Sequence, residues 1–336
     1  MKKTLCFGEL LLRLSPSSGG DWLQANAVPA FVGGAEANVA TALALWDQPV
    51  GYCTALPDNF LSKQLAGYLK KKYIDTAAIH YSGNRVGLYY LQQGTDVKNS
   101  GVIFDRAGSS FAQLQKGMID WDKVLEGIGW FHFSAIAASL TASAAAVCEE
   151  VLMAASAKGI TISVDLNYRN KLWQYGKQPH EIMPGLVKYC DLVMGNIWAA
   201  NVMLGIPLHE SLINQQEKKA YLQQASETSG TIQQQFPKVK TVANTFRFDR
   251  DEGIQYYTTL FQGQLFVSAE YTASKVLDKV GSGDCFMAGL IYGLNNDHDP
   301  QQTLNFATAA AYNKLFIKGD TTDQSVSQVT ATIKNA

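Results

Sequence analysis

The sequence predicts an α/β fold: a doubly wound, mainly parallel sheet with helices on both faces. Short apolar runs alternate with amphipathic stretches of helical length through most of the 336 residues. Strands separated by helices of this length form βαβ units. Hydrophobic residues make up 47% of the chain, enough for a large core. We therefore expect one domain over residues 1–336, with no linker rich in Pro or Ser.

Each expected element follows from its local pattern. The first buried strand is expected at residues 5–8, before the polar Glu9. The βα series then runs helix 35–46, strand 50–54, helix 59–71, strand 130–133, helix 141–157, strand 161–165, helix 179–188, strand 191–194 and helix 197–204. Near the C-terminus we expect an antiparallel pair at 253–260 and 264–267, after a glutamine-rich, solvated helix within 214–235.

One region interrupts the alternation of strands and helices. Residues 85–92 and 101–105 are consecutive strands with no helix between them, which predicts a small antiparallel β lid. Leu10–Leu14 can add another strand. The lid segments are therefore expected at about 10–32 and 84–108.

Composition restricts the possible partners and the compartment. The net charge of −1 argues against a basic nucleic-acid surface and against a polybasic membrane patch. No apolar stretch reaches the roughly 18 residues that a membrane span needs. The five cysteines are scattered without a Cys-x-x-Cys pair, as expected of reduced thiols. We expect a cytoplasmic protein that binds neither nucleic acid nor membrane.

The run Asp278-Lys-Val-Gly-Ser-Gly-Asp284 leads directly into an apolar helix. Gly281 and Gly283 permit a turn that other residues disfavour, and they let backbone N–H groups approach a ligand closely. With the N-terminus of the following helix, these groups form a natural phosphate site. Asp284 can be a simple N-cap, or it can take the proton of an alcohol that attacks a phosphoryl group. The turn alone leaves both roles open.

Two familiar kinase motifs are absent. The chain has no Gly-x-x-x-x-Gly-Lys-Ser/Thr loop, which excludes a P-loop enzyme. It also has no His-Arg-Asp catalytic loop, which excludes a protein kinase. The five histidines are isolated and lack metal-ligand spacing.

Two signatures resemble those of the PfkB (ribokinase-like) carbohydrate kinases. The first is the Asp278–Asp284 run with the helix after it, and the second is Val32-Gly-Gly-Ala-Glu-Ala-Asn38 near the N-terminus. They occur in the order that the family has, and the expected sheet and lid also fit it. The resemblance spans essentially the whole chain. It implies a ribokinase-like fold and a kinase that uses ATP and Mg²⁺.

The resemblance assigns roles to particular residues. Asp284 is the implied catalytic base, with Gly281, Ser282 and Gly283 holding the transferred phosphoryl group. Gly33, Gly34 and Asn38 are the implied ligands of the sugar hydroxyls, and Tyr89 covers the substrate from the lid. On the nucleotide side the implied residues are Asn196, Thr245, Arg247, Gly281, Gly283 and Asn313, with Ala309 and Ala310 near adenine. Asp278 is an expected site for a monovalent cation such as K⁺. Structural alternatives remain, since Gly33-Gly34 can be a plain turn and Tyr89 can be a packed aromatic.

Within the family, Gly8–Pro16 and Val164–Arg169 look like segments of 2-keto-3-deoxygluconate kinases. Arg13 stands where kinases for neutral sugars more often have Asp. Arg106 and Arg169 each present a planar fork suited to a carboxylate, although each alone is more typical of a surface charge. The expected substrate is therefore a sugar acid, phosphorylated on a primary hydroxyl. A neutral-sugar or nucleoside kinase and a non-catalytic sugar-binding regulator remain alternatives, and a homodimer through the lid is a further expectation.

One position departs from the family pattern. The family's Asn-x-x-Glu motif falls on Asn196-Ile-Trp-Ala199, so that Ala199 replaces the glutamate. That glutamate helps to organise Mg²⁺ through water. Because Mg²⁺ keeps several waters and relies on substrate phosphates, its loss need not abolish metal binding.

Overall fold

Strands and helices alternate along most of the chain in the computed structural model. The structure describes residues 3–16, 22–23, 26–92, 101–209, 212, 217–250 and 253–334. The strands are β1 (Lys3–Phe7), β2 (Leu11–Leu14), β3 (Ala30–Gly33), β4 (Val50–Leu56), β5 (Ile79–Tyr81), β6 (Gly87–Tyr90), β7 (Ile103–Asp105), β8 (Ile128–Ser134), β9 (Thr161–Asp165), β10 (Leu192–Gly195), β11 (Thr241–Arg250), β12 (Gly253–Phe261), β13 (Leu265–Val267) and β14 (Tyr271–Ala273). The helices are α1 (Ala35–Leu45), α2 (Phe60–Lys71), α3 (Trp121–Val124), α4 (Ala135–Ser139), α5 (Ala142–Ala157), α6 (Pro179–Val187), α7 (Ile197–Leu204), α9 (Lys218–Gln235), α10 (Ser282–Asn295), α11 (Pro300–Lys314) and α12 (Val326–Lys334).

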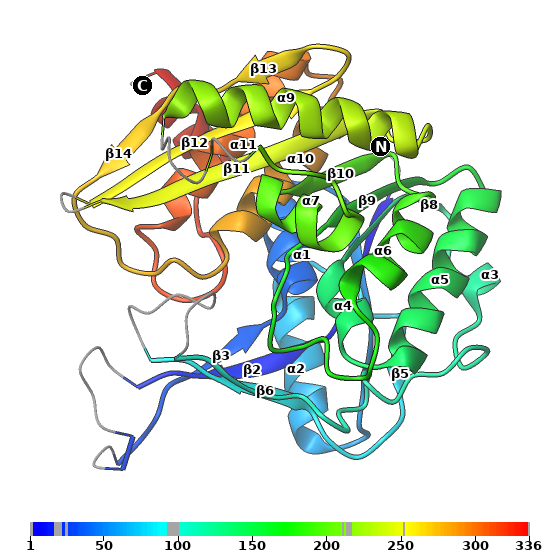
Figure 1. Ribbon diagram of the computed structural model, residues 1–336. Coiled ribbons are helices and arrows are strands. Elements are labelled where there is room, and N and C mark those ends of the chain that lie inside the picture. Colours follow the sequence, from blue (N-terminus) through cyan, green and yellow to red (C-terminus); the bar gives the residue numbers. More distant parts are fainter. Residues whose placement is uncertain are drawn as a thin grey trace.

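The main sheet has ten strands in the order β13-β12-β11-β10-β9-β8-β1-β4-β5, with β14 paired to β12 (Figure 1). All pairings from β11 to β5 are parallel, whereas β12 runs antiparallel to β11, β13 and β14. This topology confirms the predicted doubly wound, mainly parallel sheet and the predicted β12–β13 pair.

Helices cover both faces of the main sheet, as predicted. Buried side chains of α1, α2, α10, α11 and α12 form one apolar core, with Leu43, Leu69, Phe286, Leu304 and Val329 among them. Helices α3 to α7 form the core on the opposite face, around Phe131, Val151 and Met183. Helix α9 packs beside α7, where Tyr221 contacts Phe246 and Phe248.

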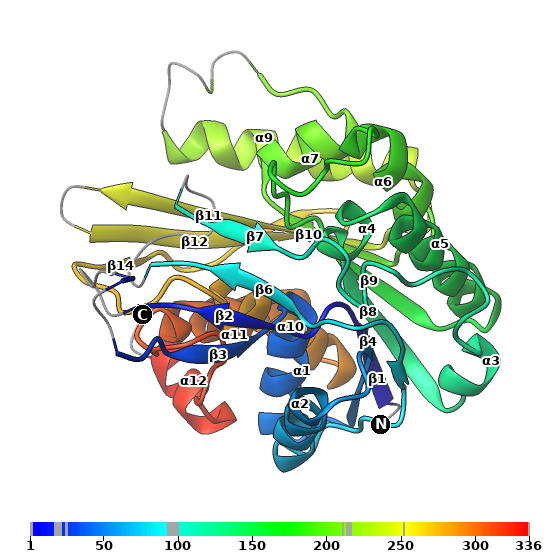
Figure 2. The same cartoon turned by 90° about the horizontal axis from the view of Figure 1, so that it is seen from below.

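The second sheet is the predicted lid, a four-stranded sheet in the order β3-β2-β6-β7. Figures 1 and 2 show it projecting from one side of the main body. The β6–β7 pair is antiparallel, as predicted from residues 85–92 and 101–105, and Leu11–Leu14 forms the additional strand. Strand β3 was not predicted. Moreover, β2 pairs with β6 in parallel, so that the small sheet is antiparallel only in its two outer pairs.

Two further elements differ from the sequence-based expectation. Strand β11 was not predicted, because its polar residues obscure the alternation, yet it pairs with β10 on one side and β12 on the other. The helix expected within 214–235 begins at Lys218, and residues 214–216 lie outside the described residues. It is not simply solvated, because Gln224 is buried and bonds Thr228 Oγ1 at 3.0 Å.

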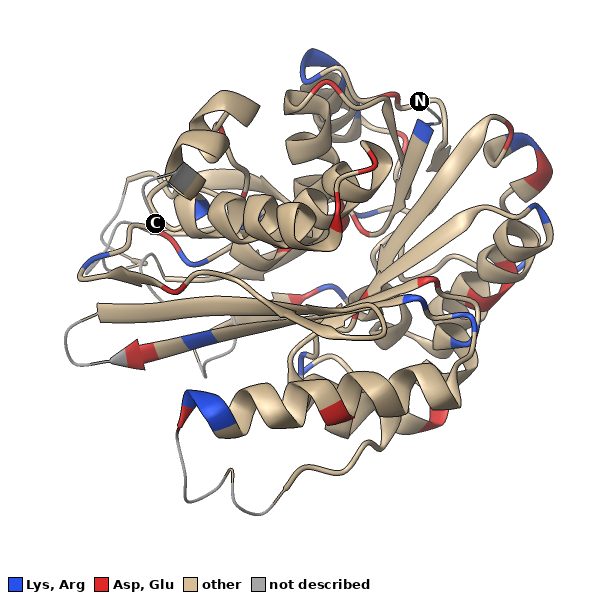
Figure 3. Cartoon of the chain, turned by 90° about the horizontal axis from the view of Figure 1, so that it is seen from above, with Lys and Arg blue, Asp and Glu red and all other residues tan. Residues whose placement is uncertain are grey.

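Charged residues of both signs are distributed along the described chain. Figure 3 shows Lys and Arg interspersed with Asp and Glu over the helices and loops. In the part of the chain that the structure describes, no helix is both long enough and apolar enough to cross a membrane.

Candidate active site

A cavity of about 700 Å³ lies where β9 and β10 end and the lid approaches the main sheet. Ligands bind outside the carboxyl ends of the strands in open parallel sheets. Residues from separate parts of the chain line it, among them the start of α1, the lid, the loop after β9, the end of β10 with α7, the β11–β12 pair, the 279–284 turn and Asp320. Of the predicted site residues, those that line the cavity are Gly34, Asn38, Tyr89, Arg106, Arg169, Asn196, Thr245, Arg247, Gly281, Ser282, Gly283 and Asp284.

Asp284 is not the N-cap of its helix. Gly281 occupies the N-cap position with φ 80°, a left-handed conformation that favours glycine. Asp284 lies in the first turn of α10, and its Oδ2 accepts a hydrogen bond of 2.7 Å from Asn38 Nδ2. The capping alternative is therefore wrong, and Asp284 instead lines the cavity.

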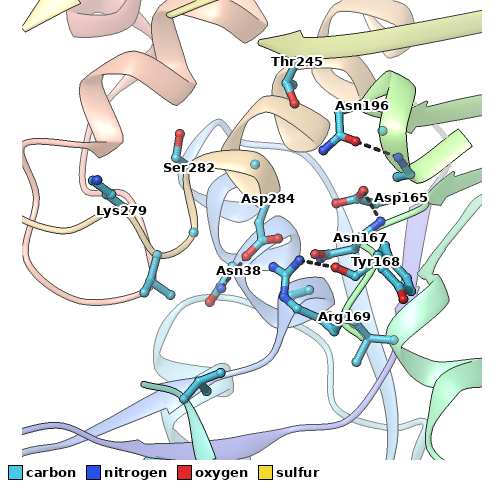
Figure 4. Close-up of a pocket in the computed structure, with 18 of the residues that line it drawn as sticks. Asn38, Asp165, Asn167, Tyr168, Arg169, Asn196, Thr245, Lys279, Ser282 and Asp284 are labelled. Carbon is cyan, nitrogen blue, oxygen red and sulfur yellow. Dashed lines mark hydrogen bonds between the residues drawn. The ribbon is translucent and has the colours of Figure 1, made fainter. Parts of the chain in front are cut away.

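The Asp284 carboxyl group lies in an environment that disfavours its charged form. Burial, reinforced by the negative charges of Asp165 and Glu36, raises the pKa of Asp284 to about 8, against the opposing effects of Asn38 and Arg169. Figure 4 shows Arg169 reaching toward Asp284 from the loop after β9, with Asn38 close by. A carboxyl group with a pKa in this range can exchange a proton at neutral pH.

The loop after β9 presents a second carboxylate. Asp165 Oδ1 accepts a hydrogen bond of 2.9 Å from the backbone N–H of Asn167, which has an unusual φ of 26°. Arg169 Nη1 donates to the carbonyl oxygen of Tyr168 at 2.9 Å, and this bond helps to fix the guanidinium (Figure 4). Lys171 Nζ reaches across to the carbonyl oxygen of Val102 at 2.9 Å and so ties this loop to the lid.

The first glycine signature brings a buried glutamate to the site. Gly34 has φ 134°, and a Cβ at this position would lie 2.6 Å from the carbonyl oxygen of Glu9. Glu36 follows in the first turn of α1, where it accepts hydrogen bonds from the backbone N–H and the hydroxyl of Ser134. Burial raises the pKa of Glu36 to about 7. Gly33 does not line the cavity, because it packs between the side chains of Leu11, Tyr89 and Asp320.

The lid residues that line the cavity already bond other side chains of the protein. Tyr89 OH donates a hydrogen bond of 2.8 Å to Asp320 Oδ2. Arg106 is buried and its Nε forms an ion pair with Glu9. The alternative of a surface charge is therefore wrong for Arg106, and only its remaining N–H groups can face a ligand carboxylate.

Thr245 and Arg247 of β11 also line the cavity, as does Asn196. Asn196 is the N-cap of α7 and its Oδ1 accepts from the backbone N–H of Ala199 at 2.7 Å. Asn313 does not line the cavity, because its side chain bonds Thr332 on α12 at 3.0 Å. Ala309 and Ala310 are fully buried within α11, so their side chains offer no surface to adenine.

Sequence reasoning gave no role to several residues that line the cavity. Glu36, Asp165 and Lys279 lie inside the sequence segments that resemble the kinase family. Their position in those segments could have predicted that they line the site. Tyr256 and Asp320 had no such signal, since only the tertiary fold brings them to the cavity. Among the described residues, no group of three or more His, Cys, Asp or Glu side chains is arranged as a metal site.

Comparisons with known proteins agree with this geometry. The model of the pfkB family of carbohydrate kinases matches residues 1–325. A 2-dehydro-3-deoxygluconokinase from Thermotoga maritima has a TM-score of 0.89 and 32% identity, covering 99% of this chain and 100% of that one. A PfkB family carbohydrate kinase from Listeria grayi has a TM-score of 0.86 and 29% identity, covering 99% and 100%.

A curated relative acts on a related sugar acid, as its name states. The 2-dehydro-3-deoxygalactonokinase of Haloferax volcanii is 24% identical over 314 residues, which is 94% of this chain and 91% of the relative. The family match covers nearly the whole sequence, and the ribokinase-like sheet, the lid and the glycine turn are all in place. This chain belongs to the pfkB family of carbohydrate kinases and is an ATP-dependent carbohydrate kinase.

Proposed function

We propose that the protein phosphorylates a primary hydroxyl of a sugar acid, converting 2-keto-3-deoxygluconate to its 6-phosphate. The observation that carries the proposal is the position of Arg106 and Arg169, which reach the cavity that holds Asp284 from the lid and from the main sheet. Guanidinium groups bind carboxylates through paired, charge-assisted hydrogen bonds. The names of relatives that act on acidic or deoxygenated sugar derivatives support the same substrate class.

In this proposal Asp284 is the general base. Its carboxylate takes the proton of the sugar hydroxyl while that oxygen attacks the γ-phosphorus of ATP, and the bond between that phosphorus and the bridging oxygen of ADP breaks. Asn38 holds the carboxylate toward the cavity. The backbone N–H groups of the Gly281–Gly283 turn stabilise negative charge on the transferred phosphoryl group.

The donor set of the cavity fits a magnesium ion that is held mainly by nucleotide phosphates. Asp165 and Asn196 place side-chain oxygens in the cavity, and hard oxygen ligands are those that Mg²⁺ prefers. Bound there, the ion would neutralise phosphate charge. Thr245, Arg247 and Lys279 line the same region and would hold the nucleotide.

A neutral sugar remains a second candidate substrate, and one observation favours it. The Nε of Arg106 is already paired with the buried Glu9, so this arginine carries less uncompensated charge than an unpaired one.

A substrate panel tests the assignment. We expect turnover with 2-keto-3-deoxygluconate to exceed that with fructose, ribose, gluconate and nucleosides by at least tenfold in kcat/KM. Equal or higher kcat/KM for a neutral sugar would overturn the acid assignment without affecting membership of the family.

We also propose two properties of the protein in its surroundings. A homodimer through the lid is supported by Ile103, an apolar residue on the edge strand β7 whose side chain is 64% exposed. Light scattering after gel filtration tests it, and a monomeric mass at micromolar concentration would contradict it.

A cytoplasmic location is supported by the five cysteines, all of which are buried and unpaired.

A further inference from the structure

A fully buried lysine lies behind the phosphate-binding turn. Lys314 is the last residue of α11, and its side chain has no exposed surface. Its Nζ donates a hydrogen bond of 2.9 Å to the carbonyl oxygen of Ile317. A buried ammonium group is costly unless negative groups surround it. Such a residue is retained only where its charge is compensated.

The compensating groups are two buried carboxylates, Asp278 and Asp320, which are 2% and 4% exposed. Arg13 of the lid strand β2 forms ion pairs with both, with Nη2 at 2.9 Å from Asp278 Oδ2 and Nε at 2.9 Å from Asp320 Oδ1. Burial lowers the pKa of Lys314, and the negative charges of Asp278 and Asp320 oppose that shift. Arg13 therefore pairs directly with both buried carboxylates, and Lys314 interacts with them electrostatically.

These residues touch the turn that begins α10. A Cβ on Gly281 would lie 1.8 Å from the carbonyl oxygen of Asp320 and 3.4 Å from Lys314 Cε. The backbone N–H groups of Leu277 and Asp278 both bond the carbonyl oxygen of Leu315, at 2.8 and 3.2 Å. The segment after Lys314 therefore packs directly against the phosphate-binding turn and restricts its conformation.

The residues around Asp278 do not fit the monovalent cation expected there. Its Oδ1 accepts from the backbone N–H of Val280 at 3.1 Å, and its Oδ2 accepts from Arg13 and from the backbone N–H of Gly319 at 2.9 and 3.1 Å. A bound K⁺ would have to displace these donors and would lie near two positive side chains. The prediction of a K⁺ site at Asp278 disagrees with this structure.

We propose that Lys314 is a positioning residue for the Gly281–Asp284 turn, and that its ammonium group makes the enzyme independent of added monovalent cations. The ammonium group holds the 315–320 segment through Ile317 and adds a second positive charge near the two carboxylates that Arg13 pairs with. This inference depends on ATP binding at the turn and not on the identity of the sugar.

Calorimetric titration with MgATP tests the proposal without any sugar. The protein is compared in KCl, NH₄Cl and choline chloride at equal ionic strength. For the natural protein we expect the same Kd in all three salts, within twofold. Lys314→Ala leaves a cavity lined by oxygens, and we expect a Kd about tenfold weaker in choline that K⁺ or NH₄⁺ restores to within about threefold.

Two further variants separate charge from packing. Lys314→Met keeps the apolar stem but lacks the ammonium group and leaves no room for an ion, so its Kd should be weak in all three salts. Thr308→Ala is the matched control, since Thr308 is buried on the same helix and bonds Thr258 at 2.6 Å, away from the turn. Its Kd should not respond to the choice of cation.

Three results would each overturn the proposal. A natural protein that binds MgATP several times more tightly in K⁺ than in choline overturns the proposal, and this comparison needs no variant to fold. So does a Lys314→Ala variant with an unchanged Kd in choline. A loss in Lys314→Ala that no cation restores indicates a packing role and also overturns it.

Discussion

Asn38 and Asp284 lie 246 positions apart in the chain, yet a hydrogen bond of 2.7 Å joins their side chains. The bond links the first turn of α10 to α1 and brings the two glycine-rich signatures into one site. Because Asn38 donates to the carboxylate, it favours the charged form, while burial favours the neutral one. This balance sets the protonation state of the proposed base.

Replacing the proposed base should abolish most activity without harming the fold. Asp284→Asn keeps the size of the side chain and an acceptor for Asn38 but cannot take a proton. We expect kcat to fall by about 10² to 10⁴-fold, the usual contribution of a general base. Initial rates of ADP formation measure it, and near-normal turnover would show that Asp284 has no role in proton transfer.

The same variant should be at least as stable as the natural protein at pH 8. The folded-state pKa of Asp284 is raised from 3.8 to about 8, so the folded protein retains this proton longer than the unfolded chain does. The stability linked to this group is therefore present at low pH and is lost as the pH rises through about 8. An amide has no such loss. Thermal unfolding at pH 6 and pH 8 checks the sign, and a variant that becomes relatively less stable at pH 8 contradicts it.

The pH profile of the natural enzyme should show the raised pKa directly. We expect kcat/KM to rise with pH, with its midpoint near pH 8 and a plateau above it, because Asp284 must be deprotonated to act as a base. Glu36→Gln removes a nearby negative charge, so it should move the midpoint to lower pH. An identical midpoint in the two proteins would indicate that Glu36 does not influence the base.

Much of the fold could be predicted from the sequence, because local patterns specify it. The βα units and the turn ending at Asp284 are encoded by apolar periodicity and by glycines close together in the chain. Strand β3 is too short to stand out, and β11 becomes a strand because neighbours on both sides supply its hydrogen bonds.

The polar contacts of the site could not be predicted in the same way. Arg106 and Glu9 are separated by 97 positions, and Arg13 and Asp278 by 265. Neither pair has a local signature, because each depends on the lid being placed over the main sheet. Lys314 is similar: at the end of a helix it suggests a solvated charge, and only the fold buries it.

Restoring the family's glutamate should change the use of Mg²⁺. Ala199 lines the cavity beside Asn196 at the start of α7. In Ala199→Glu an added carboxylate can hold water molecules of the metal ion, so half-maximal activity should need several times less free Mg²⁺. Ala199→Gln is the control of similar size without charge. Superimposable Mg²⁺ titrations for the natural protein and the Glu variant would show that a side chain at position 199 does not interact with the metal ion or its water molecules.

The substrate class can be tested through Arg169, with Arg106 treated separately. Removing Arg106 alone would leave Glu9 buried and unpaired, which typically costs about 3–5 kcal/mol of stability. The appropriate variant is therefore the double change Glu9→Gln with Arg106→Met, compared with Glu9→Gln alone. Arg169→Met can be made singly.

If the substrate carries a carboxylate, each arginine should contribute a charge-assisted bond worth about 1.5–3 kcal/mol. Its loss should raise KM for 2-keto-3-deoxygluconate about 10 to 100-fold, at about 1.4 kcal/mol per decade. Arg169→Lys keeps the charge but loses the planar fork, so it should recover only part of the affinity. Arg169 also lowers the pKa of Asp284, so kcat can change for every substrate. The decisive quantity is therefore the ratio of KM changes between the acid and a neutral analogue without the carboxylate. A ratio near one would assign both arginines to lid closure or to the nucleotide, and would favour the neutral-sugar alternative.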